Sequence, residues 1–252
     1  MLAYNDSGTY TFVLLYDGNS LTRAQASADV GSILRRAGVR RADGESLALD
    51  LAAVAAGAEF QNPTIATLAG GEVYVECKRL PGLGDPVIEL QIGAACFMRR
   101  ALFAVEGYTA DVRDRLVEMV GDFAAIDGFL AGFTVCLGDD EDERHYRRWF
   151  AECTQNGRLS LQRLLNHDYL STELVAVGPG HIAMHGRDVF LKCPAWRVLE
   201  PREDVICVFM DNVVWGSSRS RLDKVSHVRE ALAHLRRHLK DDASAGNEPQ
   251  CE

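Results

Sequence analysis

Residues 62–80 read NPTIATLAGGEVYVECKRL, and this stretch decides the fold that we expect for the chain. Its two β-prone runs lie at 64–68 and 73–80, and a further run at 87–93 follows the loop PGLGDP. We predict a strand for each run, with the strands at 73–80 and 87–93 paired across that loop. Because side chains alternate along a strand, one face of 73–80 carries Tyr74, Glu76 and Lys78.

The charged pair on that face allows two interpretations. In the first, the strand is half-buried with a solvated outer face, on which Glu76 pairs weakly with Lys78. In the second, a carboxylate and a lysine two residues apart belong to a site that cleaves phosphodiester bonds. The elements around the strand bear on this choice.

The elements of the middle of the chain follow the order α-β-β-β-α-β. The apolar pattern predicts helices at 45–56 and 109–126 and strands at 58–60, 64–68, 73–80 and 132–137. Elsewhere we expect a strand at 10–16, a helix capped by Ser20 and running to about Ala37, and helix over 141–165 with a break near Asn156-Gly157. We also expect strands at 173–177, 181–185, 188–192 and 204–210, and a helix at 220–239. The predicted class is α+β, with a mixed sheet and flanking helices.

This middle part of the chain resembles the PD-(D/E)xK nuclease superfamily, which has the restriction-endonuclease-like fold. GESLALDLAAVAAGAEF at 44–60 looks like the first helix and strand of that family. Residues 62–80 look like the catalytic hairpin of that family, in which the third strand of the core carries Glu-x-Lys. The resemblance spans residues 43–137 and implies a restriction-endonuclease-like core there, followed by a C-terminal α+β region.

The resemblance implies a Mg²⁺-dependent nuclease that acts on nucleic acid. Glu76 and Lys78 would be catalytic, with Glu76 a metal ligand, Lys78 the cation beside the scissile phosphate, and Glu45 a possible outer ligand. The position of the family's aspartate is occupied by Thr64, a poor substitute for a carboxylate at a divalent cation. Either Glu59 serves as the missing ligand, or the chain is a catalytically degenerate relative of these enzymes.

Charge supports an alternative function. The net charge of −9 is unfavourable for a protein that coats nucleic acid, and it suits a protein that binds a basic partner. The alternative is therefore a non-enzymatic cytoplasmic binding protein, such as an immunity protein that inhibits a bacterial toxin. The acidic run at 139–143 either imitates phosphates on such a surface or favours the start of a helix.

The remaining features are the division of the chain into segments, its cysteines and one pair of histidines. We divide the chain into a strand-helix segment (1–42), the nuclease-like core (43–137), the C-terminal region (138–240) and a disordered tail (241–252). Seven scattered cysteines without a CxxC pair favour neither structural zinc nor a disulfide framework, and they indicate a cytoplasmic protein. His181 and His185 would face the same way on a strand, which is a weak basis for a metal site without a third ligand.

Overall fold

One sheet at the centre of the molecule contains strands from the whole length of the chain. The computed structural model describes residues 9–23, 30–41, 50–57, 64–68, 71–80, 87–94, 110–137, 148, 150–155, 158–165, 174–210 and 218–239. Nine strands form this sheet in the order β10-β11-β9-β6-β1-β5-β4-β3-β2, and β7 and β8 form a separate hairpin. The strands are β1 (Thr9–Asp17), β2 (Arg40–Arg41), β3 (Thr64–Leu68), β4 (Gly71–Leu80), β5 (Val87–Ala94), β6 (Phe129–Leu137), β7 (Thr154–Gln155), β8 (Arg158–Leu159), β9 (Leu174–Val177), β10 (Arg197–Arg202) and β11 (Val205–Phe209).

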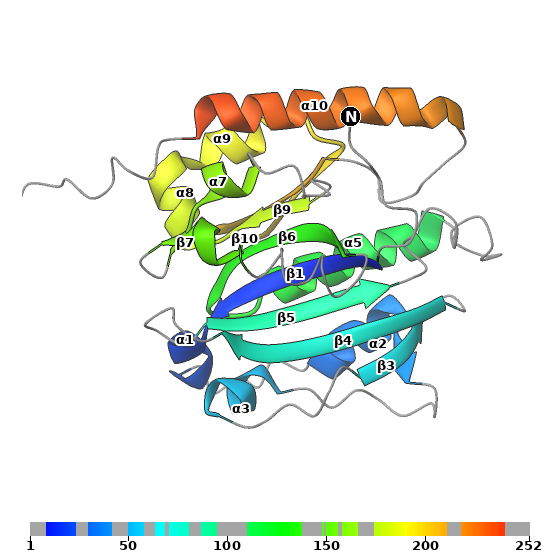
Figure 1. Ribbon diagram of the computed structural model, residues 1–252, viewed down its shortest axis with the longest axis vertical. Coiled ribbons are helices and arrows are strands. Elements are labelled where there is room, and N and C mark those ends of the chain that lie inside the picture. Colours follow the sequence, from blue (N-terminus) through cyan, green and yellow to red (C-terminus); the bar gives the residue numbers. More distant parts are fainter. Residues whose placement is uncertain are drawn as a thin grey trace, which may run out of the picture.

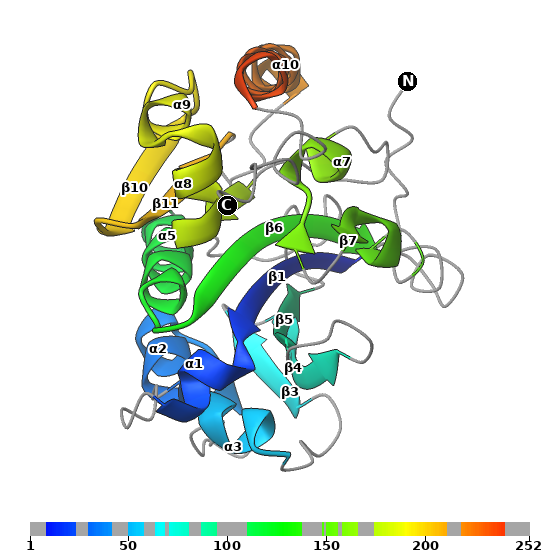
Figure 2. The same ribbon diagram turned by 90° about the vertical axis from the view of Figure 1, so that its left-hand side faces the viewer.

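Helices cover both faces of the sheet (Figure 1; Figure 2). They are α1 (Gly18–Arg23), α2 (Val30–Ala37), α3 (Leu51–Ala55), α5 (Ala110–Ala124), α7 (Leu161–Leu165), α8 (Pro179–His185), α9 (Arg187–Leu191) and α10 (Ser218–His238). Side chains of α1, α2, α3 and α5 form one core with the sheet. Side chains of α7, α8, α9 and α10 form a second core on the opposite face. Among the described helices, none is long and apolar enough to cross a lipid bilayer.

Strand β1 occupies the middle of the sheet, between β5 and β6. Its residues 12–16 are apolar and fully or almost fully buried, as expected for a strand covered on both faces. Phe12 and Tyr16 enter the first core, whereas Val13 enters the second. The Tyr16 hydroxyl donates a hydrogen bond to the Phe123 carbonyl of α5 (3.1 Å), which fixes that helix against the sheet. The N-terminal strand is therefore part of the main core, and the segment boundaries that we drew at 42, 137 and 240 stay a prediction.

The structure confirms the α+β class and most of the elements around the predicted hairpin. The strands at 64–68, 73–80 and 87–93 are present as β3, β4 and β5, and β4 pairs with β5 as expected. The predicted helix at 109–126 is α5, and β6 includes the predicted strand at 132–137. Every described pairing in the nine-stranded sheet is antiparallel, so the sheet differs from the mixed one that we predicted.

Four local predictions are wrong. Residues 181–185 and 188–192 lie mainly in helices α8 and α9, because Pro179 opens a helix in its first turn and Gly186 (φ 90°) separates the two. His181 and His185 are thus one helical turn apart. Helix α1 starts at Gly18, since the Asp17 carboxylate, and not Ser20, accepts from the first amides. Residues 154–155 and 158–159 lie on either side of the expected helix break near Asn156-Gly157, but they pair as strands where we expected helix, and the predicted strand at 58–60 lies outside the described residues.

Candidate functional site

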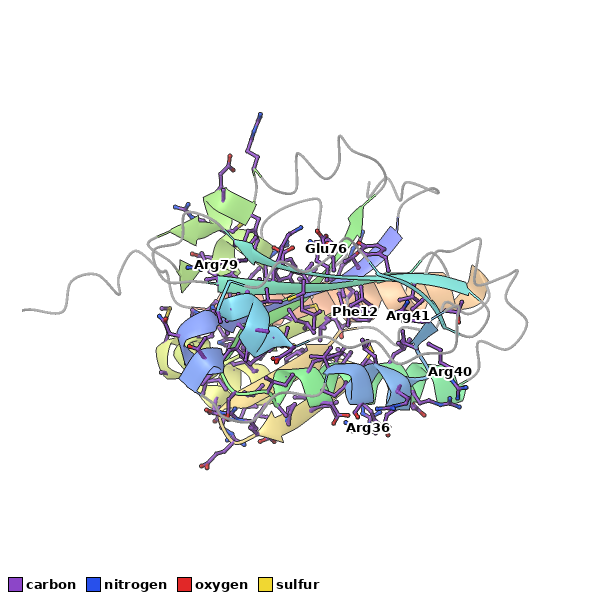
Figure 3. The ribbon with its side chains drawn as sticks, turned by 90° about the horizontal axis from the view of Figure 1, so that it is seen from below. Phe12, Arg36, Arg40, Arg41, Glu76 and Arg79 are labelled. Carbon is purple, nitrogen blue, oxygen red and sulfur yellow. The ribbon has the colours of Figure 1, made fainter. Side chains whose placement is uncertain are left out.

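The polar face of β4 and β5 carries a group of four side chains that we name the carboxylate–lysine cluster. Its members are Glu76 and Lys78 on β4 and Glu89 and Gln91 on β5. In the antiparallel register Glu76 lies opposite Gln91, and Lys78 lies opposite Glu89, so all four project from the same face. With the sheet seen edge-on, Glu76 and the core residue Phe12 lie on opposite sides of it (Figure 3).

The Lys78 ammonium group lies between the two carboxylates of the cluster. Its Nζ is 3.3 Å from Oε2 of Glu76 and 3.7 Å from Oε1 of Glu89. The Glu89 side chain is only 1% exposed, whereas those of Glu76 and Lys78 are 29% and 24% exposed. Gln91 donates a further hydrogen bond from Nε2 to the same Glu89 oxygen. A buried carboxylate is costly without such partners, so the cluster is arranged around Glu89.

A pair of hydroxyl groups extends the polar face towards the other end of β4. The Tyr74 hydroxyl and Thr11 Oγ1 share a hydrogen bond of 2.7 Å that links β4 to β1 across β5. On β1 the same face then becomes apolar, because Val13 lies opposite Gln91 and Leu15 lies opposite Glu89. The cluster therefore borders the second hydrophobic core directly.

The opposite face of β4 contains Cys77, which is unsuited to chemistry. Burial is the main cause that raises the pKa of its thiol to about 12, and the negative charges of Glu89 and Glu76 contribute to the same shift. A thiol with such a pKa stays protonated near neutral pH, and a protonated thiol is neither a good nucleophile nor a metal ligand. Any function of β4 therefore belongs to the face of Glu76 and Lys78.

The cluster can be compared with the needs of Mg²⁺, the ion that the nuclease resemblance implies. Mg²⁺ prefers oxygen ligands, and Glu76 and Glu89 could offer carboxylates. In this arrangement, however, the Lys78 ammonium already neutralises both, and Gln91 occupies the same Glu89 oxygen as a donor. Within the described ranges, no group of three or more His, Cys, Asp or Glu side chains could hold a metal ion. The side chains as placed do not fit Mg²⁺.

The predicted site residues have different outcomes. Glu76 and Lys78 lie together, with an ion pair between them. Glu45 and Glu59 lie outside the described residues, so their roles stay predictions. Thr64, at the position of the family's aspartate, pairs with Val75 and not with Glu76. The sequence reasoning missed Glu89, although a Glu and a Gln at alternate positions of the apolar run VIELQIG are a signal for a polar stripe on a strand.

The histidine pairs have local roles in the structure. The His181 and His185 rings are stacked with centroids 6.3 Å apart, and His181 Nε2 is 2.9 Å from the Leu159 carbonyl oxygen. On α10, His234 Nε2 is 2.8 Å from the Val189 carbonyl oxygen of α9. These contacts join α8 to β8 and α10 to α9.

Comparison with known proteins gives few matches. No family model and no curated protein matches the sequence. A solved structure described as "Pseudomonas aeruginosa T6SS protein PA0821" aligns with 91% of this chain and 73% of its own, at 12% sequence identity and a TM-score of 0.41. A similarity of this size assigns neither a fold family nor a function to the chain.

Proposed function

We propose that this chain is a non-enzymatic binding protein for a protein partner, of the kind represented by toxin immunity proteins. The observation that carries the proposal is the position of Lys78 between Glu76 and Glu89. In this arrangement the three charged groups satisfy one another, and Gln91 completes the environment of the buried Glu89. Such a network stabilises a surface, whereas a hydrolytic metal site needs carboxylate oxygens that are available to the ion.

A second candidate function is metal-dependent cleavage of phosphodiester bonds, as the nuclease resemblance implies. One observation favours it: the Lys78 ammonium group lies 3.3 Å from the Glu76 carboxylate and 3.7 Å from the Glu89 carboxylate on a β-hairpin, with Glu89 in place of a ligand from the preceding strand. These are the residue types that such sites use. The candidate requires Lys78 to leave the carboxylates before a metal ion can bind.

Metal binding and cleavage separate the two candidates. We would measure Mg²⁺ and Mn²⁺ binding by calorimetry and cleavage of duplex DNA, single-stranded DNA and RNA, for the wild type, Lys78→Ala and Lys192→Ala. Lys192 is a matched control because it is an exposed lysine that pairs with Asp188 on α9. The binding-protein proposal expects no cleavage by any of the three proteins. It also expects metal binding to be stronger in Lys78→Ala than in the wild type, because the variant removes the ammonium group that pairs with both carboxylates.

The opposite pattern would establish the second candidate. Metal-dependent cleavage by the wild type and by Lys192→Ala, together with its loss in Lys78→Ala, would show that Lys78 is a catalytic residue. Equal metal binding by all three proteins, without cleavage, would contradict the view that Lys78 competes with a cation for the cluster.

A further inference from the structure

The two edges of the nine-stranded sheet carry arginines in different environments. Strand β10 forms one edge and β2 forms the other. An edge strand exposes unpaired backbone groups, and proteins commonly protect it with charges, proline or bulges. The protection of these two edges can therefore be compared directly.

The β10 edge is protected by every one of these devices. Arg202 pairs with Asp127 and Asp204 (2.9 and 3.0 Å), and Arg197 Nη1 lies 3.9 Å from Asp114. Glu200 accepts from Arg187, so each charged residue of β10 has a partner of opposite sign. Pro201 removes a backbone donor, and the register with β11 shifts between residues 199 and 202. This edge has little capacity for another strand.

The β2 edge is basic. Four arginines occur within residues 35–41, and Figure 3 shows Arg36, Arg40 and Arg41 on the same side of the molecule. Arg40 is exposed, and Arg35 donates to the Ser32 hydroxyl (2.9 Å). Over the described ranges, neither Arg35 nor Arg40 pairs with a carboxylate. Arg36 pairs with Asp122 at 2.6 Å, but both side chains are exposed, and such a pair contributes little.

The helix alone does not account for this concentration of charge. Arg35 and Arg36 in the last turn of α2 interact favourably with the helix dipole. Arg40 lies beyond Gly38, on strand β2, where that dipole has no such effect. In a chain of net charge −9, the patch is an exception that the fold does not require.

We infer that the β2 edge is a docking surface for an extended acidic segment of a protein partner. The segment would add a strand beside β2 through backbone hydrogen bonds, while its carboxylates meet Arg35, Arg36 and Arg40. An extended peptide suits an edge strand better than a nucleic acid does, and the overall negative charge also disfavours a polyanion as large as nucleic acid. The inference names the surface and the partner chemistry of the proposed binding protein, and so rests on that function.

Binding of a defined acidic peptide tests this surface. The probe is a short fluorescein-labelled poly-L-glutamate, followed by fluorescence anisotropy with the full chain at low and at physiological salt. The variant Arg35→Glu/Arg40→Glu reverses two charges at the β2 edge, and Arg35→Gln/Arg40→Gln removes them. The matched control is Arg229→Glu/Arg237→Glu, because both arginines are exposed on α10, which packs on the second core, whereas α2 packs on the first. Circular dichroism verifies that each variant is folded.

We expect the charge reversal at β2 to weaken binding by about tenfold or more, a change that corresponds to 1.4 kcal/mol. The neutral variant should weaken binding less, and the α10 control should bind like the wild type. Amide hydrogen exchange of residues 39–41 should slow when the peptide binds, because the added strand would pair with that edge.

Several results would overturn the inference. They are the absence of wild-type binding at low salt, equal losses in the β2 and α10 variants, and unchanged hydrogen exchange at 39–41. If a single-stranded oligonucleotide of equal formal charge bound more tightly than the peptide, the ligand of this surface would be nucleic acid and not a protein segment. Metal-dependent cleavage in the assay above would refute the proposed function without changing the comparison of β2 and α10 variants, so the two failures are distinguishable.

Discussion

The same face of the sheet is apolar on one half and polar on the other. On β1, β6, β9 and β11 it carries side chains such as Val13 and Phe133, which α7, α9 and α10 bury in the second core. On β4 and β5 it carries the carboxylate–lysine cluster, with Glu89 as deeply buried as its apolar neighbours. Adjacent strands of one regular sheet thus place hydrocarbon side chains and the carboxyl group of Glu89 side by side, at similar burial.

The apolar and polar halves of this face are stabilised in different ways. In the apolar half, stability grows with the area removed from water, and it depends on no single partner. In the polar half, each buried group must find a partner, so the loss of one member leaves the others uncompensated. Variants in the two halves should therefore differ both in the size of their effects and in whether a second substitution repairs them.

The largest effect is expected in the apolar half. Phe133 is fully buried and stacks on Phe150, with ring centroids 6.2 Å apart. Phe133→Ala should lower the free energy of unfolding by about 4 kcal/mol, because it removes buried area and leaves a cavity. Urea unfolding measures this change. The control in the polar half is Tyr74→Phe, which removes only the hydroxyl bonded to Thr11 and should cost about 1 kcal/mol. Equal losses in the two variants would contradict the comparison.

The next effect concerns thiols buried on both sides of the sheet. Burial raises the pKa of Cys77 and Cys207 in the first core, and of Cys153 and Cys193 in the second, from 9.0 to about 12. At pH 8 the thiolate fraction of each is then about a thousandfold lower in the folded protein than in the unfolded chain. Iodoacetamide labelling, followed by mass spectrometry of each cysteine peptide, should be slower in buffer than in urea by a similar factor.

The same pKa values fix the direction of the alkaline response. Native thiols keep their protons up to about pH 12, whereas unfolded thiols release theirs near 9.0. Unfolding therefore releases protons in this range, so the stability contributed by the buried thiols is complete below pH 9 and is lost as the pH rises towards 12. Rapid native labelling of Cys77 at pH 8 would show that the face of β4 opposite the cluster is open to solvent.

The alternation of side chains along a strand is a short-range pattern, and it predicted only the part of the site that lies within one strand. Alternation along 73–80 placed Glu76 and Lys78 on one face, and the structure confirms their pairing. Glu89 was missed because its role depends on the register of β4 and β5, which brings it opposite Lys78. The run VIELQIG by itself indicates a strand with a polar stripe, but it does not indicate which residues lie opposite that stripe. The second carboxylate is thus a product of tertiary pairing, and sequence reasoning looked for it on the preceding strand, at Glu59.

Errors in the fold have a similar physical origin. Short apolar segments such as HIAMH suit a strand or a buried helix equally well by periodicity, and Pro179 decided for the helix. Strand β10 was not predicted because Arg197, Glu200 and Pro201 look like loop residues. The structure places them on a sheet edge, where charges and proline are normal. For β10 the deciding information is the position of the segment in the sheet.

A smaller effect than that of Phe133→Ala is expected for Lys78→Met, which breaks the polar half without creating a large cavity. The variant leaves the buried Glu89 with Gln91 but without its ammonium partner. We expect a loss of about 2 kcal/mol in the free energy of unfolding, since the Lys78 side chain is partly exposed and water can replace some of its interaction. The double variant Lys78→Met/Glu89→Met should recover much of this loss, because an apolar pair suits a position that borders Val13 and Leu15.

The double-mutant cycle by urea unfolding measures that recovery, and Glu76→Gln serves as its control. Glu76 is the more exposed carboxylate, so its substitution should cost no more than about 1 kcal/mol. If Glu76→Gln cost as much as Lys78→Met, the ammonium group would serve the outer carboxylate and not the buried one. If the double variant were no more stable than Lys78→Met, the polar half would not follow the pairing rule that distinguishes it from the apolar half. A recovery in the double variant, together with a small cost for Glu76→Gln, would mean that the cluster is organised around Glu89.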